Sequence, residues 1–176
     1  RGWFAFTSNV DGSFQRAGLD PERVVECHGA LDYLQCVRGC GAPIDRADAY
    51  EPDVDEATFR ARRPLPTCAG CGGLAPPNGR MVGDGGWASE RTDAQEARFA
   101  AWLDELRAVR PKLVVIECGA GTAVPTVRLS SERVAQRLGG VLVRVNVREP
   151  EVPAGHLGIA EGALAALEKL AALVGA

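Results

Sequence analysis

Four of the six cysteines come in two pairs, and this spacing constrains the fold more than any other feature of the sequence. Cys36 and Cys40 are separated by three residues, Cys68 and Cys71 by two, and 27 residues lie between the pairs. Glycines in or beside both pairs allow tight turns, so each pair can direct two thiolates at one point. Four thiolates bind Zn2+ at tetrahedral corners and leave no open position for water. The spacing therefore favours a structural zinc site over four unrelated reduced cysteines.

The composition supports a metal site and argues against several classes of partner. The chain has 176 residues, of which 46% are hydrophobic and 24% charged, so it is long enough for one domain with a core. Small secreted disulfide proteins are usually shorter and richer in loops. The net charge of −3 provides no basic patch for nucleic acid, and no apolar run reaches the roughly 20 residues of a membrane span. We therefore expect a cytoplasmic protein without a direct nucleic-acid or membrane partner.

Apolar runs and helical periodicity alternate in both terminal parts of the chain. The pattern predicts strands at residues 3–7, 24–27, 113–116 and 141–147, and helices near 14–19, 92–109, 130–138 and 164–174. Continuous apolar runs are typical of strands that helices cover on both faces. The alternation predicts an α/β fold with a Rossmann-like, doubly wound parallel sheet. Cys27 falls inside a predicted strand and Cys118 directly after one, and a free cysteine at such a place packs as a small hydrophobic residue.

The middle of the chain has a different character. Prolines, glycines and cysteines become frequent and helical periodicity fades, which indicates a zinc-binding module over residues 31–90. Residues 1–30 and 91–176 then form the Rossmann-like domain. Its helix at 92–109 begins with Thr92 and Gln95 at the spacing of a capping box. Because the first strand has no upstream neighbour in the sequence, we expect this domain to be incomplete at its N-terminus.

Polar residues directly follow the first two predicted strands. Thr7, Ser8, Asn9 and Asp11 come after the first strand, and His28 comes after the second. In open parallel sheets, ligands bind beyond the C-terminal ends of the strands. However, Asn and Asp are also common in turns, and a lone histidine is more often structural than catalytic. Taken alone, these residues leave both interpretations open.

The segments TSNVDG and ECHG, followed by two cysteine pairs, stand in the order typical of sirtuins, the NAD-dependent protein deacylases. The chain resembles this family over most of its length. The resemblance does not include the family's first motif, a glycine-rich phosphate loop, so the chain is similar to the C-terminal portion of a sirtuin. It implies NAD as co-substrate and an acylated-lysine protein as substrate. The implied products are nicotinamide, free lysine and O-acyl-ADP-ribose.

The resemblance also implies roles for the polar residues. Asn9 would position the nicotinamide ribose and a water, Asp11 would bind the nicotinamide carboxamide, and Thr7 would lie beside the co-substrate. His28 would act as general base toward a ribose hydroxyl, which a neutral imidazole can do at cellular pH. Ser8 stands where the family has a glutamine that contacts the ribose. Because the serine side chain is shorter, this departure bears on the rate and on the preferred reaction.

Two segments in the last third of the chain carry further matches to NAD contacts. The run from Gly119 to Thr122 resembles the family's G-T-S segment, which makes Gly119, Gly121 and Thr122 candidate contacts of the co-substrate. Glycines there allow backbone N–H groups to approach a phosphate or ribose. Asn146 matches the family's I-N segment, whose amide contacts the adenosine ribose. Its alternative role is that of a turn residue at the end of a strand.

A weaker match concerns the substrate. Residues 81–84 resemble the family's F-G-E segment, which lines the acyl-lysine channel and pairs with the substrate backbone. Val82, Gly83 and Asp84 are therefore candidate substrate contacts. Val82 replaces the phenylalanine and Asp84 replaces the glutamate of that segment.

Two other functions compete with deacylation. An ADP-ribosyltransferase or NAD hydrolase would keep the NAD site, and Ser8 together with the three-residue spacing of the first cysteine pair leaves room for it. His28 favours deacylation, since capture by the acyl group is completed through that base. A non-catalytic, zinc-stabilised interaction module is the alternative from another class, and the missing first motif favours it.

Overall fold

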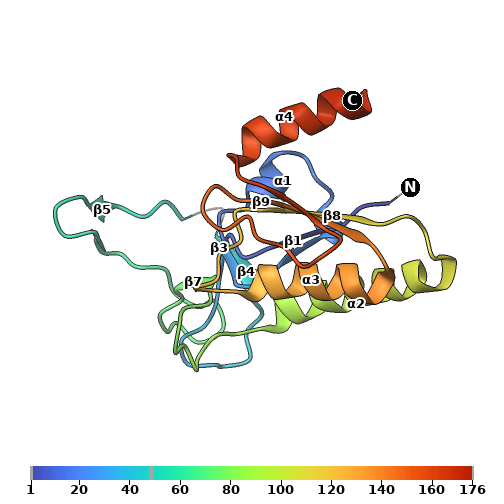
Figure 1. Cartoon of the computed structure of the whole chain (residues 1–176). Helices are drawn as coiled ribbons and strands as arrows, with labels where there is room; N and C mark the ends of the chain where they lie inside the picture. Colours follow the sequence, from blue (N-terminus) through green and yellow to red (C-terminus); the bar gives the residue numbers. More distant parts are fainter. Residues whose placement is uncertain (1, 48–49, 176) are drawn as a thin grey trace. The chain divides into compact units, whose positions relative to one another are not determined.

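The computed structural model describes residues 2–47 and 50–175 (Figure 1). These residues divide between Ala101 and Trp102 into two units. In the first unit, β1 (Ala5–Thr7) and β2 (Val24–Glu26) form a parallel pair. The short helix α1 (Ser13–Arg16) and the 3-10 helix η1 (Pro21–Arg23) connect them. Val24 and Val25 are fully buried, as expected for a strand covered on both faces. The predicted strands and turns are confirmed, although β1 begins two residues later than predicted.

The rest of the first unit consists of short strands and turns. β3 (Gly29–Leu34) pairs antiparallel with β4 (Asp45–Arg46) and with β7 (Pro77–Gly79). A separate hairpin is formed by β5 (Val54–Asp55) and β6 (Arg60–Ala61). These elements bury few apolar side chains, in agreement with a segment that has little core of its own. The predicted division at residues 30 and 90 stays a prediction.

Helix α2 (Glu90–Val109) begins two residues earlier than the predicted helix. The predicted capping box at Thr92 and Gln95 is wrong. Both side chains are buried and form hydrogen bonds with Glu26 of β2, so they do not satisfy the first amides of the helix. Their spacing on one helical face allows both to meet the same strand.

The second unit contains a parallel sheet in the order β10, β9, β8. β8 (Val114–Cys118) and β9 (Val141–Val145) are joined through α3 (Thr126–Leu138), and β10 (Leu157–Ile159) leads to α4 (Ala163–Val174). Helix α3 begins four residues earlier than predicted, and β10 was not predicted. Gly139 ends α3 in the left-handed conformation that favours glycine (φ 64°).

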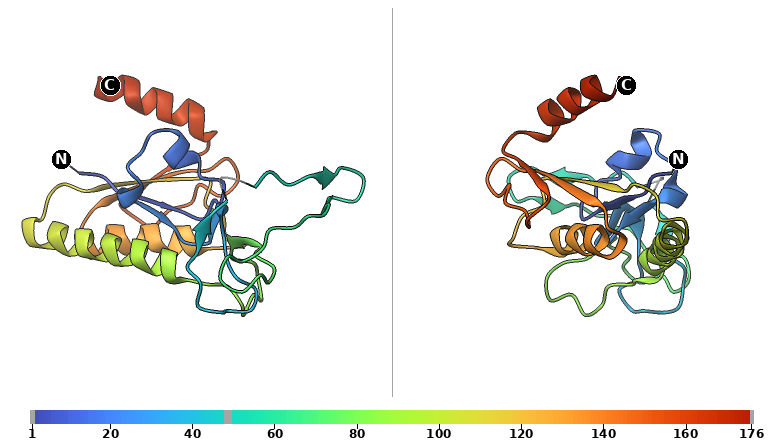
Figure 2. Two further views of the ribbon diagram at one scale, coloured as in Figure 1. Left: turned by 180° about the vertical axis from the view of Figure 1, so that it is seen from behind. Right: turned by 45° about the vertical axis from the view of Figure 1, so that its right-hand side comes forward.

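Helices cover both faces of this sheet (Figure 2). Val143 and Val145 point to one face and pack with Ala166 of α4. Arg144 points to the opposite face and reaches Glu132 of α3. This arrangement confirms the doubly wound α/β fold. None of the helices within residues 2–47 and 50–175 combines the length and apolar character needed to cross a bilayer.

Strand β8 is less buried than the sequence predicted. The apolar run in β8 was expected to be covered on both faces, but Val114 and Ile116 are 58% and 51% exposed. Within the described part of this unit, β8 is an edge strand that pairs only with β9. An edge strand has fewer neighbours to cover alternate side chains, whereas the central strand β9 is buried along most of its length.

Candidate functional site

The first group of predicted site residues lies in the loop that follows β1. Thr7 is buried at the end of the strand, and its hydroxyl accepts a hydrogen bond from the Asn9 amide at 3.0 Å. Ser8 is half-buried and Asn9 is exposed. This hydrogen bond turns the chain sharply out of the strand. The Asn9 side chain is therefore accessible to a ligand at the C-terminal end of the sheet.

Asp11 also holds the local turn. Its carboxylate accepts a hydrogen bond from the Ser13 amide at 3.0 Å, and Arg16 donates to its carbonyl oxygen. The hydrogen bond from the Ser13 backbone, followed by that from the Ser13 hydroxyl and the charge of Arg16, lowers the pKa of Asp11. The carboxylate therefore remains ionised at neutral pH. It can accept a hydrogen bond from a ligand amide but cannot donate one.

His28 lies in the connection between β2 and β3 and is half-buried. Its carbonyl oxygen accepts a hydrogen bond from the Arg80 amide at 2.8 Å. Gly29, which follows, has φ 75°, and a Cβ at this position would lie 2.0 Å from the carbonyl oxygen of Asn78. Only glycine therefore fits directly after His28. This explains the H-G dipeptide physically.

The third group, residues 81–84, forms a turn just after β7. The Asp84 amide donates to the Met81 carbonyl at 3.1 Å, and the Asp84 carboxylate accepts from the Gly86 amide at 2.9 Å. The Val82 side chain is fully exposed. The predicted channel residues thus lie on a surface turn in the described structure.

Backbone hydrogen bonds bring these three segments of the first unit together. Leu31 of β3 donates to Val10 at 2.8 Å and so ties the loop after β1 to the strand after His28. The bond from Arg80 to His28 ties the segment after β7 to the same place. Three separate stretches of the sequence therefore meet beside His28, while Val82, Gly83 and Asp84 lie on the surface turn beyond Arg80.

The remaining predicted co-substrate contacts lie in the second unit. Gly119 follows β8 with φ 71°, and Gly121 and Thr122 continue the loop. The Glu149 carboxylate accepts from the Thr122 amide at 2.7 Å and from its hydroxyl at 2.8 Å. These two donors of Thr122 are engaged by a side chain of the same unit. A ligand that used them would have to displace Glu149 or bind through its carboxylate.

Asn146 is similarly engaged after β9. Its side-chain oxygen accepts from the amides of Arg148 and Glu149 at 2.9 and 3.0 Å. Its amide nitrogen donates to the Ala120 carbonyl at 3.1 Å. Asn146 therefore links the loops after two neighbouring strands. The turn-residue role is present in the structure, and a ribose contact stays a prediction.

Two residues that hold the loops after β8 and β9, Glu149 and Arg128, were not among the residues predicted from the sequence. Besides Glu149, Arg128 of α3 donates to the carbonyl oxygens of Ala120, Glu149 and Glu151. The sequence gives little signal for either residue, because charged side chains such as arginine and glutamate are common on exposed surfaces. Only their partners in the fold reveal their function.

The predicted metal ligands form a compact cluster. The Sγ atoms of Cys36, Cys40, Cys68 and Cys71 all lie within 4.8 Å of one another. The Sγ atoms of Cys36 and Cys71 are 3.6 Å apart, and so are those of Cys40 and Cys68. A tetrahedral zinc with bonds of about 2.3 Å requires sulfur atoms about 3.8 Å apart. The donor set and its spacing therefore fit zinc.

Local turns create this cluster and influence its thiols. Gly39 and Gly72 have positive φ values of 57° and 66° in the two turns. Backbone hydrogen bonds from Cys40 and Arg38 lower the pKa of Cys36 to about 6. At Cys40, a hydrogen bond from the Ala42 backbone lowers the pKa, but the hydrogen bonds with the three neighbouring thiols outweigh it and raise the pKa to about 12. The turns thus favour a thiolate at Cys36, the form in which cysteine binds metal.

The other two cysteines do not belong to the cluster. Burial raises the pKa of Cys27 to about 11, and partial desolvation together with the neighbouring Glu117 carboxylate raises the pKa of Cys118. Thiols in this state are poor nucleophiles. Cys27 is 5% exposed, which agrees with its predicted packing role. Cys118, in contrast, is exposed at the end of the edge strand β8, so its predicted packing role is wrong.

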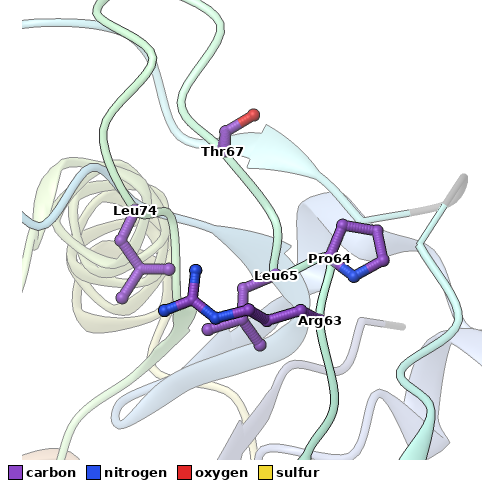
Figure 3. Close-up of a pocket in the computed structure, with 5 residues that line it drawn as sticks. All are labelled: Arg63, Pro64, Leu65, Thr67 and Leu74. Carbon is purple, nitrogen blue, oxygen red and sulfur yellow. The ribbon is translucent and has the colours of Figure 1, made fainter.

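A pocket of about 690 Å3 is lined by residues that precede and follow the second cysteine pair in the sequence (Figure 3). It is lined by Arg63, Pro64, Leu65, Thr67 and Leu74. None of the predicted site residues lines it, so it is separate from the convergence around His28.

The chain is similar in sequence to known proteins. The model of the Sir2 family matches residues 2–116. The NAD-dependent protein deacetylase SIR2rp1 of Leishmania major is 28% identical over 142 residues, which cover 78% of this chain and 35% of that protein. The NAD-dependent protein deacylase 2 of Pseudomonas syringae pv. tomato is 39% identical over 75 residues, or 42% of this chain and 26% of the relative. The chain thus spans about a third or less of the length of these relatives.

Solved structures show the same fold. A Sir2 homologue in complex with ADP-ribose superposes with a TM-score of 0.64 at 21% identity, covering 96% of this chain and 58% of the other. Sir2Tm bound to a propionylated peptide gives a TM-score of 0.63 at 21% identity, covering 98% and 64%.

Proposed function

Because the chain belongs to the Sir2 family, we propose that it is the catalytic portion of an NAD-dependent protein-lysine deacylase. The observation that carries the proposal is the convergence of the loop after β1, His28 and the segment after β7. The names of the relatives from Leishmania major and Pseudomonas syringae support the same activity. The structures with ADP-ribose and with a propionylated peptide support NAD and an acylated-lysine protein as the two substrates.

NAD supplies an activated ribose carbon whose bond to nicotinamide breaks, so that the acyl oxygen of the substrate can attack it. The residues of this chain would orient the reactants and move one proton. Asn9, which is exposed at the end of β1, would position the ribose and a water. Asp11, held ionised by its hydrogen bonds with Ser13, would accept from the nicotinamide amide. His28 would take the proton of a ribose hydroxyl.

The loops of the second unit would contact the adenosine half of NAD. Gly119 and Gly121 carry no side chains that would block an approach to the loop, and the Gly119 amide donates to the Val145 carbonyl at 2.9 Å. Thr122 and Asn146, whose polar groups are bonded within this unit, would have to exchange partners to contact the ribose. Because the Glu149 carboxylate occupies the donors of Thr122, it would accept hydrogen bonds from ribose hydroxyls and disfavour a phosphate at this place. Val82, Gly83 and Asp84 would contact the substrate peptide through their surface turn.

The four-cysteine cluster is proposed to bind one structural Zn2+. All four positions of a tetrahedral ion would be filled by thiolates, so the metal would organise residues 31–90 without taking part in the reaction. Reduced thiols persist in reducing compartments, which supports the cytoplasm as the location of the protein.

The test is a reaction of the natural full-length gene product with NAD and an acetyl-lysine peptide, followed by mass spectrometry. Deacylation consumes one water and yields free lysine, nicotinamide and O-acyl-ADP-ribose in equal amounts. Nicotinamide without free lysine would instead indicate ADP-ribosyl transfer or NAD hydrolysis, and no product would indicate an interaction module.

The same assay tests the role of His28. His28→Ala is expected to slow deacylation by about 10²- to 10⁴-fold, as for other losses of a general base. Zinc content and the circular dichroism spectrum serve as controls for folding. Turnover at the parental rate would show that His28 is not the base.

A further inference from the structure

Glu26, the last residue of β2, is held by side chains of a single helix at its backbone amide, its carbonyl and its carboxylate. The Glu26 amide donates to the Gln95 side chain at 3.0 Å, and the Thr92 hydroxyl donates to the Glu26 carbonyl at 3.1 Å. Arg91 forms an ion pair with the carboxylate, and Gln95 donates to the same carboxylate at 3.4 Å. Side chains of the first turns of α2 thus hold both the backbone and the side chain of this one residue.

This network is buried, and its composition is unusual for packing alone. Glu26, Thr92 and Gln95 are 1%, 3% and 4% exposed. Apolar side chains would join a helix to a strand without desolvating charges, and a buried ion pair contributes little net stability compared with such packing. Hydrogen bonds, unlike apolar contacts, are directional and fix one orientation of the groups that they join.

The same helical turn also holds the strand on the other side of His28. The Arg91 guanidinium lies over the Tyr33 ring of β3, 3.9 Å from its centroid. β2 ends at Glu26 and β3 begins at Gly29, so Cys27 and His28 form the whole connection between two anchored strands. A shift of either strand end would therefore move the imidazole.

We propose that Glu26, Arg91, Thr92 and Gln95 are positioning residues that fix the place of His28. The catalytic importance of this positioning rests on the proposed function, in which His28 is the proton acceptor and needs a fixed geometry. Misplacement of a reacting group by about 1 Å can cost roughly 100-fold in rate. The helix would thus hold the imidazole at the distance that proton transfer requires.

The direct test uses the fact that the chain has only two histidines, His28 and His156. With selectively labelled histidine, NMR gives two imidazole signal sets, which the His28→Ala variant assigns. Thr92→Val removes the hydroxyl that bonds Glu26 and is expected to shift and broaden the His28 signals while His156 stays unchanged. Thr92→Ser retains the hydroxyl and should restore the parental His28 signals.

A matched control lies on the same helix. Arg98 pairs with Glu22 at 3.1 Å, but this exposed pair joins α2 to the N-terminal side of β2, away from His28. Arg98→Gln should leave both histidines unchanged. If Thr92→Val leaves the His28 signals in place, or if Arg98→Gln moves them equally, the proposal is overturned. Should Thr92→Val not fold, Arg91→Lys carries the same test, because lysine cannot both pair with Glu26 and stack on Tyr33.

Kinetics of the full-length gene product provide the second readout. Exchange of labelled nicotinamide into NAD needs only the bond cleavage that precedes the action of His28, whereas deacylation needs His28. Thr92→Val is expected to lower kcat for deacylation by about 10- to 100-fold and to leave exchange nearly unchanged. Equal loss of both rates would indicate general damage and overturn the positioning role. A parental protein without deacylation would refute the proposed function, while the NMR result would still decide the positioning of His28.

Discussion

Glu117 and Arg144 lie opposite each other in the register of β8 and β9, and both are buried, at 2% and 1% exposure. Arg144 also bonds Glu132 of α3 at 2.9 Å and the backbone of Glu151. Burial alone would lower the pKa of Arg144, but its hydrogen bonds with Glu117 and Glu132 raise it. One buried cation thus joins two strands, a helix and the loop after β9.

Removal of one partner of this pair should be costly. Glu117→Gln is expected to reduce the free energy of unfolding by about 3 kcal/mol, because Arg144 would keep its charge in a buried site with only Glu132 to pair with. Urea denaturation measures the loss. The exposed pair of Glu161 and Lys169 offers a control, and Glu161→Gln should change stability by less than about 0.5 kcal/mol. Equal effects of the two variants would contradict a special role for burial.

The glycine after His28 is expected to be irreplaceable. Gly29→Ala combines a left-handed backbone (φ 75°) with a Cβ placed 2.0 Å from the Asn78 carbonyl oxygen. Gly18→Ala is the matched control, since it has φ 82° but no atom within 4 Å of the new Cβ. The control should lose about 1–2 kcal/mol through the backbone conformation alone. Thermal unfolding should show a clearly larger loss for Gly29→Ala, and similar losses would mean that the structure yields around Asn78.

The cysteine cluster should hold one zinc ion per chain. Elemental analysis of freshly purified, reduced protein is expected to give this ratio, and Cys68→Ser should abolish it and unfold residues 31–90, because metal binding there contributes directly to folding. Cys118→Ser, which lies outside the cluster, should retain the metal. Acid should release the zinc, since thiolates must stay deprotonated to bind it. Protein purified without zinc would disprove the assignment.

The loop at Thr122 should respond to acid through Glu149. Hydrogen bonds from the Thr122 hydroxyl, and then from its amide, lower the pKa of Glu149 from its ordinary value of 4.5. Because the folded-state pKa is lowered, the ionised carboxylate stabilises the loop above pH 4.5, and this stabilisation is lost as the pH falls through the folded-state pKa. The NMR shift of the Thr122 amide should follow this titration. In Glu149→Gln the acid transition should vanish, and its persistence would point to another group.

Much of the fold follows from local properties of the sequence. The apolar runs at β2 and β9 predict buried strands, because continuous hydrophobic segments need cover on both faces. The spacing of Cys36, Cys40, Cys68 and Cys71 predicts their cluster, because short turns bring each pair to one point. The order of the loop after β1 and of His28 predicts their convergence, since parallel strands end at the same edge of a sheet.

Only the tertiary structure decided which partner each polar side chain has. Thr92 and Gln95 fit a capping box by spacing, yet they bond Glu26, which is 69 residues from Gln95. Thr122 meets Glu149 across 27 residues, and Arg144 meets Glu117 across the same separation. Helix periods and turn preferences depend on neighbours within a few residues, so the sequence by itself determined the elements and the cysteine cluster. Hydrogen bonds between distant residues depend on how those elements pack, because burial makes an unpaired polar group costly and so selects the partner that packing brings within reach.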